Sequence, residues 1–146
     1  MREPRRARQR ECRRTGLGTA LLLAGLGAGI GTGTGAQAQP VGDPTRGAAI
    51  VASRQQGLCV LCHAVPGQPE AAMGNLGPPL HGVGARYTAE QLRQRLEAPE
   101  RFNPDSVMPS YTRTQGLQQV ARARQGEPLF NAQQLADVVA YLSRLK

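Results

Sequence analysis

Two cysteines and a histidine stand together in the run Cys59-Val60-Leu61-Cys62-His63. This C-x-x-C-H motif is typical of covalent haem c attachment. Cysteines three positions apart share one face of a helical turn, so each thiol can reach one vinyl group of the same macrocycle. The histidine follows at once and can ligate the iron. The motif predicts one haem, attached covalently through Cys59 and Cys62, with His63 as an axial ligand.

Other chemistry for this motif has less support. A zinc site needs about four ligands. Residues 39–146 offer only Cys59, Cys62, His63 and His81, with no second ligand pair at the usual spacing. A thioredoxin-like redox pair would follow a β-strand, and no strand pattern precedes Cys59. Haem attachment is therefore the preferred interpretation.

The second axial ligand has three candidates, Met108, Met73 and His81. Met108 lies in a loop with two prolines, which fix φ and stiffen the backbone. Met73 lies among small residues, in a segment expected to be mobile, and His81 is close in sequence to the side of the haem that His63 occupies. The proline-stiffened loop therefore favours Met108 as the second ligand. A neutral thioether stabilises Fe(II). With both axial positions filled, the iron has no open site for a substrate, which favours electron transfer over haem catalysis.

Two further groups are expected near the haem. A haem-ligating histidine usually donates its other ring N–H to a carbonyl, and we expect Gly77-Pro78-Pro79-Leu80 to supply that carbonyl. Arg86 can pair with a haem propionate. On its position alone, a solvated surface charge explains Arg86 equally well.

The elements that position these residues are predicted to be helices. Asp43-Pro44 is an N-cap followed by proline at the first helical position, which predicts a helix over 43–54. Residues 88–91 match a capping box and predict a helix that stops before Pro99. Asn131 can cap a final helix with an amphipathic face. That face holds Leu135, Val138, Val139 and Leu142.

No segment alternates with period two over strand length, so the predicted fold class is all-α. A short helical turn is expected around Leu117 and Val120. Long Pro- and Gly-rich connections fill 65–84 and 99–111, and loops of that length in a small domain usually carry function. We expect helices and long loops wrapped around one haem, whose apolar bulk supplements a limited core.

The first quarter of the sequence predicts a signal peptide over residues 1–38. A basic stretch ends near Arg14, an apolar stretch covers 17–30, and Ala36-Gln37-Ala38 is an A-x-A cleavage site. The alternative is an amino-terminal membrane anchor, but the apolar run is shorter than the ~20 residues that span a bilayer. The prediction is a periplasmic protein whose mature domain, residues 39–146, has no membrane span.

The formal net charge of +8 does not indicate a nucleic-acid partner. Seven of the 18 basic and two of the 10 acidic side chains lie in residues 1–38, which leaves 11 basic and eight acidic, or +3, for the remainder. The basic stripe of a nucleic-acid binder is absent from that remainder.

The run Gly77-Pro78-x-Leu80-x-Gly82, followed by Arg86, resembles class I cytochromes c. The resemblance implies the small class I cytochrome c fold. It also implies that the carbonyl of Pro78 accepts a hydrogen bond from the axial His63, and that Arg86 contacts a propionate.

A longer ordered pattern over about residues 57–145 is similar to the SoxX family, the monohaem subunits of SoxAX thiosulfate-oxidising cytochromes. The pattern comprises 75–80, 82–88, 103–111, Gly116-Leu117, Val120-Ala121, 126–129 and 137–142. The resemblance implies a SoxA-like partner that holds the catalytic haem and joins thiosulfate to a cysteine of a SoxYZ-like carrier, which this chain would meet only transiently. This chain would receive the electrons, pass them to another cytochrome, and carry no catalytic residue.

Two other functions are weighed against this one. A free class I cytochrome c shuttle would be a monomer with a charged ring around the haem edge. A haem enzyme or gas binder would keep five-coordinate iron, which ligation by Met108 would exclude.

Overall fold

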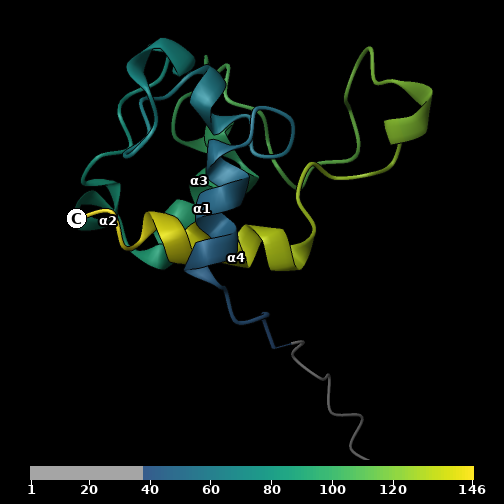
Figure 1. The fold of residues 1–146 in the computed structure, drawn as a ribbon. Coiled ribbons are helices and arrows are strands. Elements are labelled where there is room, and N and C mark those ends of the chain that lie inside the picture. Colours follow the sequence, from purple (N-terminus) through teal and green to yellow (C-terminus); the bar gives the residue numbers. More distant parts are fainter. Residues whose placement is uncertain (1–37) are drawn as a thin grey trace, which may run out of the picture. The chain divides into compact units, whose positions relative to one another are not determined.

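The computed structural model describes residues 38–146, so the predicted signal peptide lies outside the described residues apart from Ala38. Within these described residues, four α-helices follow one another (Figure 1). They are α1 (Pro44–Ala52), α2 (Val83–Arg86), α3 (Ala89–Glu97) and α4 (Ala132–Leu142). Four single 3-10 turns accompany them: η1 (Cys59–Leu61), η2 (Glu70–Ala72), η3 (Pro99–Arg101) and η4 (Arg122–Arg124). The described part contains no strand, so the predicted all-α class is confirmed.

Capping residues set the starts of the three longer helices, as predicted. The carboxylate of Asp43 accepts hydrogen bonds from the Thr45 and Arg46 amides at the start of α1. Thr88 begins α3 and Asn131 begins α4, each in a complete capping box with the glutamine three positions on. Helix α1 ends two residues earlier than predicted, because Ser53 adopts an extended conformation.

Helix α1 packs mainly against α4 (Figure 1). The two helices approach closely at Gly47, where a Cβ atom would lie 2.0 Å from the Asp137 carbonyl oxygen. The amphipathic face predicted for α4 is buried in the core. The buried hydrophobic residues are Ile50, Val51, Cys59, Val60, Val65, Val83, Leu92, Leu96, Tyr111, Phe130, Leu135, Ala136, Val138, Val139 and Leu142.

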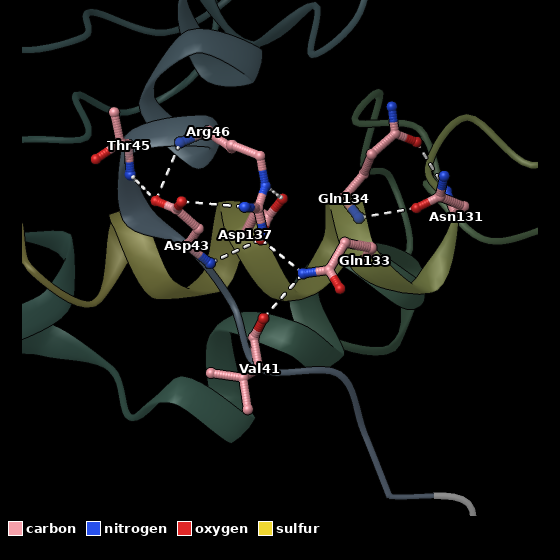
Figure 2. A network of polar contacts seen from close by, with 8 residues as sticks. All are labelled: Val41, Asp43, Thr45, Arg46, Asn131, Gln133, Gln134 and Asp137. Carbon is pink, nitrogen blue, oxygen red and sulfur yellow. Dashed lines mark hydrogen bonds and ion pairs between the residues drawn. The ribbon is translucent and has the colours of Figure 1, made fainter.

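The buried carboxylate of Asp137 links α4 to the start of α1 by hydrogen bonds (Figure 2). Asp137 of α4 is only 2% exposed and accepts hydrogen bonds from the Asp43 amide at 2.7 Å, from Arg46 Nε and Nη2 at 2.8 Å each, and from Gln133 Nε2 at 2.9 Å. The Arg46 hydrogen bond is the main cause that lowers the pKa of Asp137 from 3.8 to about 2. The amphipathic pattern of α4 did not point to this network, because its members are far apart in sequence.

Replacing Asp137 by asparagine is expected to lower the free energy of unfolding by roughly 2 to 3 kcal/mol at neutral pH, because two charge-assisted hydrogen bonds weaken while the half-exposed Arg46 stays solvated. The folded-state pKa lies below the ordinary value, so the carboxylate stabilises the fold above about pH 4 and loses this effect as the pH falls toward 2. Urea unfolding of both proteins across that range measures the difference, with D105N at an exposed loop carboxylate as the control. A wild-type advantage that does not change with pH would contradict this assignment.

The connections contain more structure than the sequence indicates. Turn η2 and helix α2 fall in or next to the predicted 65–84 loop, and η3 falls in the predicted 99–111 loop. The helical turn expected around Leu117 and Val120 is wrong, because the turn in this region covers Arg122–Arg124. The segment 112–129 extends away from the helices and is largely exposed (Figure 1). Across residues 38–146, no helix combines the length and hydrophobicity needed to cross a bilayer.

Candidate functional site

The two thiols of the C-x-x-C-H motif lie on one short helical turn. Cys59 begins η1 and is buried, whereas Cys62 follows η1 and is half-buried, and both are free thiols. In a 3-10 turn the side chains at positions i and i+3 lie one above the other. Burial raises the pKa of the Cys59 thiol. The turn therefore presents two thiols on the same side, as attachment to one macrocycle requires.

The imidazole of His63 is held in one orientation. Its Nδ1 lies 2.6 Å from the Pro78 carbonyl oxygen. Since a carbonyl only accepts, Nδ1 carries the proton, and the lone pair of Nε2 remains available to a metal. The Gly77 amide donates to the Cys62 carbonyl at 2.7 Å, and a Cβ atom on Gly77 would lie 2.4 Å from His63 Cε1. Only glycine leaves room for the ring at this place.

The three candidates for the second ligand have different surroundings. Met108 is half-buried and packs against the core from the 103–111 loop. The Met73 sulfur accepts a hydrogen bond from the Val65 amide at 2.9 Å. This bond occupies the sulfur and ties Met73 to the segment that follows His63. His81 is exposed. Of these side chains, Met108 is the thioether that accepts no hydrogen bond from residues 38–146.

Arg86 of α2 binds the loop that carries Pro78. Its Nη1 donates to the His81 carbonyl at 2.8 Å, and its Nη2 donates to the Pro79 carbonyl at 3.1 Å. Sequence reasoning did not foresee these contacts. They bind the guanidinium to the carbonyls one and three positions after Pro78, whose own carbonyl orients His63, and the side chain remains exposed and able to meet an anionic group.

Tyr111 is a residue of the site that sequence reasoning missed. Its ring is buried and stacks on Phe130 with 4.3 Å between centroids, and its hydroxyl donates to the Gly57 carbonyl at 2.8 Å. Burial raises the pKa of Tyr111, so the hydroxyl stays protonated as a donor. The signal in the sequence was an aromatic residue three positions after Met108, in a chain with few aromatics.

These donors fit a covalent haem better than a bare metal ion. The set comprises two thiols on one turn, an imidazole whose Nδ1 is bound to the Pro78 carbonyl, and a thioether, which is soft enough for haem iron. Glycine at position 77 provides the space that the oriented imidazole occupies. Over the described range 38–146, no group of three or more His, Cys, Asp or Glu side chains could hold a metal ion.

Comparisons with known proteins agree with this chemistry. The family model described as "Cytochrome c" matches residues 44–146. A solved structure titled "Crystal structure of SoxXA from P. pantotrophus" is similar to this chain at 32% sequence identity and a TM-score of 0.65. The match covers 73% of this chain and 84% of that chain. No curated protein matches the sequence.

Proposed function

Because this chain belongs to the cytochrome c family, as a SoxX-type class I cytochrome with covalently bound haem c, we propose that it is the electron-transfer subunit of a SoxAX-like thiosulfate-oxidising complex. The observation that carries the proposal is its similarity to a chain of the SoxXA structure at 32% identity over 73% of its length. The proposed partner is a SoxA-like cytochrome that bears the catalytic haem. Electrons would leave through a further cytochrome, with transient contact to a SoxYZ-like carrier.

The proposed domain is residues 39–146, which act in the periplasm after removal of a signal peptide over 1–38. It holds one haem through thioether bonds from Cys59 and Cys62, with His63 and Met108 as iron ligands. Pro78 accepts from His63, and Arg86 pairs with a propionate. Support comes from the free thiols of one turn and the 2.6 Å contact between His63 and Pro78.

Bound haem supplies a one-electron Fe(III)/Fe(II) couple. The chain's own residues set its surroundings: Pro78 keeps the proton on His63 Nδ1, which makes the imidazole a stronger ligand. The thioether of Met108 is neutral and favours Fe(II). With both ligands in place the iron has no open position for a sulfur substrate, so this chain would carry electrons and would not make or break bonds to sulfur. One haem carries one electron at a time. A two-electron conjugation therefore requires two successive transfers through this chain, or a second centre in the partner.

The test is a pull-down of the mature, haem-loaded protein from its own periplasm after growth on thiosulfate, with the absorption spectrum of the eluate. We expect a second cytochrome in stoichiometric amount that stays bound at physiological salt, because a permanent partner buries a largely apolar interface. A lone monomer with a His/Met spectrum would overturn the complex and indicate a free electron shuttle.

A further inference from the structure

Tyr111 lies where three segments of the site meet. Its amide donates to the Leu96 carbonyl of α3 at 2.9 Å, and its carbonyl accepts from the Phe130 amide at 2.8 Å. Its hydroxyl reaches the other half of the site, 2.8 Å from the Gly57 carbonyl and 3.8 Å from Cys59 Sγ. One side chain therefore joins the methionine loop to the segment that leads into the C-x-x-C-H motif.

The Gly57 carbonyl depends on this hydroxyl. Gly57 is buried, and a Cβ atom there would lie 2.2 Å from the Ile50 carbonyl oxygen of α1. Water therefore has little access. The free thiol of Cys59 is a second, weak donor at 3.3 Å, and it loses its hydrogen once Cys59 forms the proposed thioether bond to haem. Because a buried carbonyl without a good donor is costly, movement of the tyrosine away from Gly57 is penalised.

Movement of Met108 is coupled to that contact by a short stiff connection. Pro109 fixes φ directly after the methionine. Ser110 Oγ then donates to the Glu97 carbonyl at 2.5 Å, and the Tyr111 amide is bound to Leu96. A displacement of Met108 that is more than a side-chain rotation must pull on these bonds.

We propose that Tyr111 is a positioning residue whose hydroxyl, by holding Gly57, keeps the Met108 thioether in place against competing ligands. The proposal rests on ligation of the iron by Met108, as given above. It assigns Tyr111 no contact with the iron and no proton transfer.

The experiment measures imidazole binding to the ferric holoprotein, followed by loss of the near-infrared band of thioether-ligated iron. Y111F keeps the ring and its stacking on Phe130 but removes the hydroxyl. We expect its affinity for imidazole to rise about tenfold, because displacement of Met108 in the wild type must break the bond between the Tyr111 hydroxyl and the Gly57 carbonyl, and Y111F has no such bond to break. The control is Y141F, since the hydroxyl of the half-buried Tyr141 makes no hydrogen bond within residues 38–146.

The readouts separate this role from a merely structural one. A purely structural tyrosine would lower the denaturant midpoint of Y111F while leaving imidazole affinity equal to that of Y141F, and this result would overturn the proposal. A wild type without the thioether band would instead refute ligation by Met108, whatever Y111F does.

A second measurement needs no variant, should Y111F fold poorly. The Tyr111 amide is bound to the Leu96 carbonyl, and the Phe130 amide is bound to the Tyr111 carbonyl. Both amides should exchange hydrogen faster when imidazole saturates the wild-type ferric protein. Unchanged exchange would show that Met108 leaves without disturbing Tyr111, and would contradict the proposal.

Discussion

Replacing Met108 by alanine is expected to lower the reduction potential by on the order of 100 mV or more, within the ~0.8 V range that axial ligands span. Loss of the neutral thioether removes the group that favours Fe(II) and opens one face to water. The measurements are a redox titration and the ferric absorption spectrum, in which the thioether band should be absent. Carbon monoxide should also bind the ferrous variant, because a coordination position is now open.

The matched control for this change is Met73→Ala. Met73 is half-buried like Met108, but its sulfur is occupied by the Val65 amide. M73A should keep the wild-type spectrum and potential even if it is less stable. A variant pair with the opposite behaviour, in which M73A loses the band and M108A retains it, would move the ligand to residue 73.

Replacing Gly77 by alanine is expected to displace the His63 ring. The new Cβ atom would lie 2.4 Å from Cε1 and 2.6 Å from Nδ1, while hydrogen bonds hold both the ring and the Gly77 amide in place. Overpacking of this kind costs about 1 to 3 kcal/mol. We expect the haem to stay covalently bound while high-spin iron appears in the spectrum and the denaturant midpoint falls.

Gly116→Ala is the control that separates crowding from backbone strain. Gly116 has φ of +71° and no atom within 4 Å of its ideal Cβ position, so alanine there brings conformational strain alone. G116A should lose some stability but keep a low-spin spectrum. If G77A also kept a low-spin spectrum, the close approach of Gly77 would not position the ligand.

Local signals made the longer helices predictable. The caps at Asp43, Thr88 and Asn131 act within a few residues, so the sequence around each of them is sufficient to locate a helix start. Helix α2 is too short for a periodic pattern, and its place depends on distant contacts. A Cβ atom on its Gly84 would lie 2.4 Å from the Ser143 carbonyl oxygen at the end of the chain.

The candidate site likewise has parts that the local sequence predicts and parts that depend on distant residues. The spacing of Cys59, Cys62 and His63 is local and therefore visible in the sequence. The bond between Tyr111 and Gly57 joins residues 54 positions apart, and the bond between Asp137 and Arg46 joins residues 91 positions apart. No local sequence pattern indicates either pair. The resemblance implied that Arg86 contacts a propionate, and no local pattern indicated the two carbonyls of the Pro78 loop that it binds in the structure. The signal peptide, the domain limits and the ligand roles stay predictions.

The contact between α1 and α4 also determines the order in which the domain can fold. The bond from Asp43 to Asp137 closes a loop of 94 positions, so α1 gains its main partner only after almost the whole chain is available. Such long-range closure is slow compared with the formation of either helix. Cys59 and Cys62 lie inside this loop, so the core in which Cys59 is buried is complete only after the last helix docks. We therefore expect an interval before closure in which both thiols are more exposed than in the folded domain, which suits their proposed attachment to a haem.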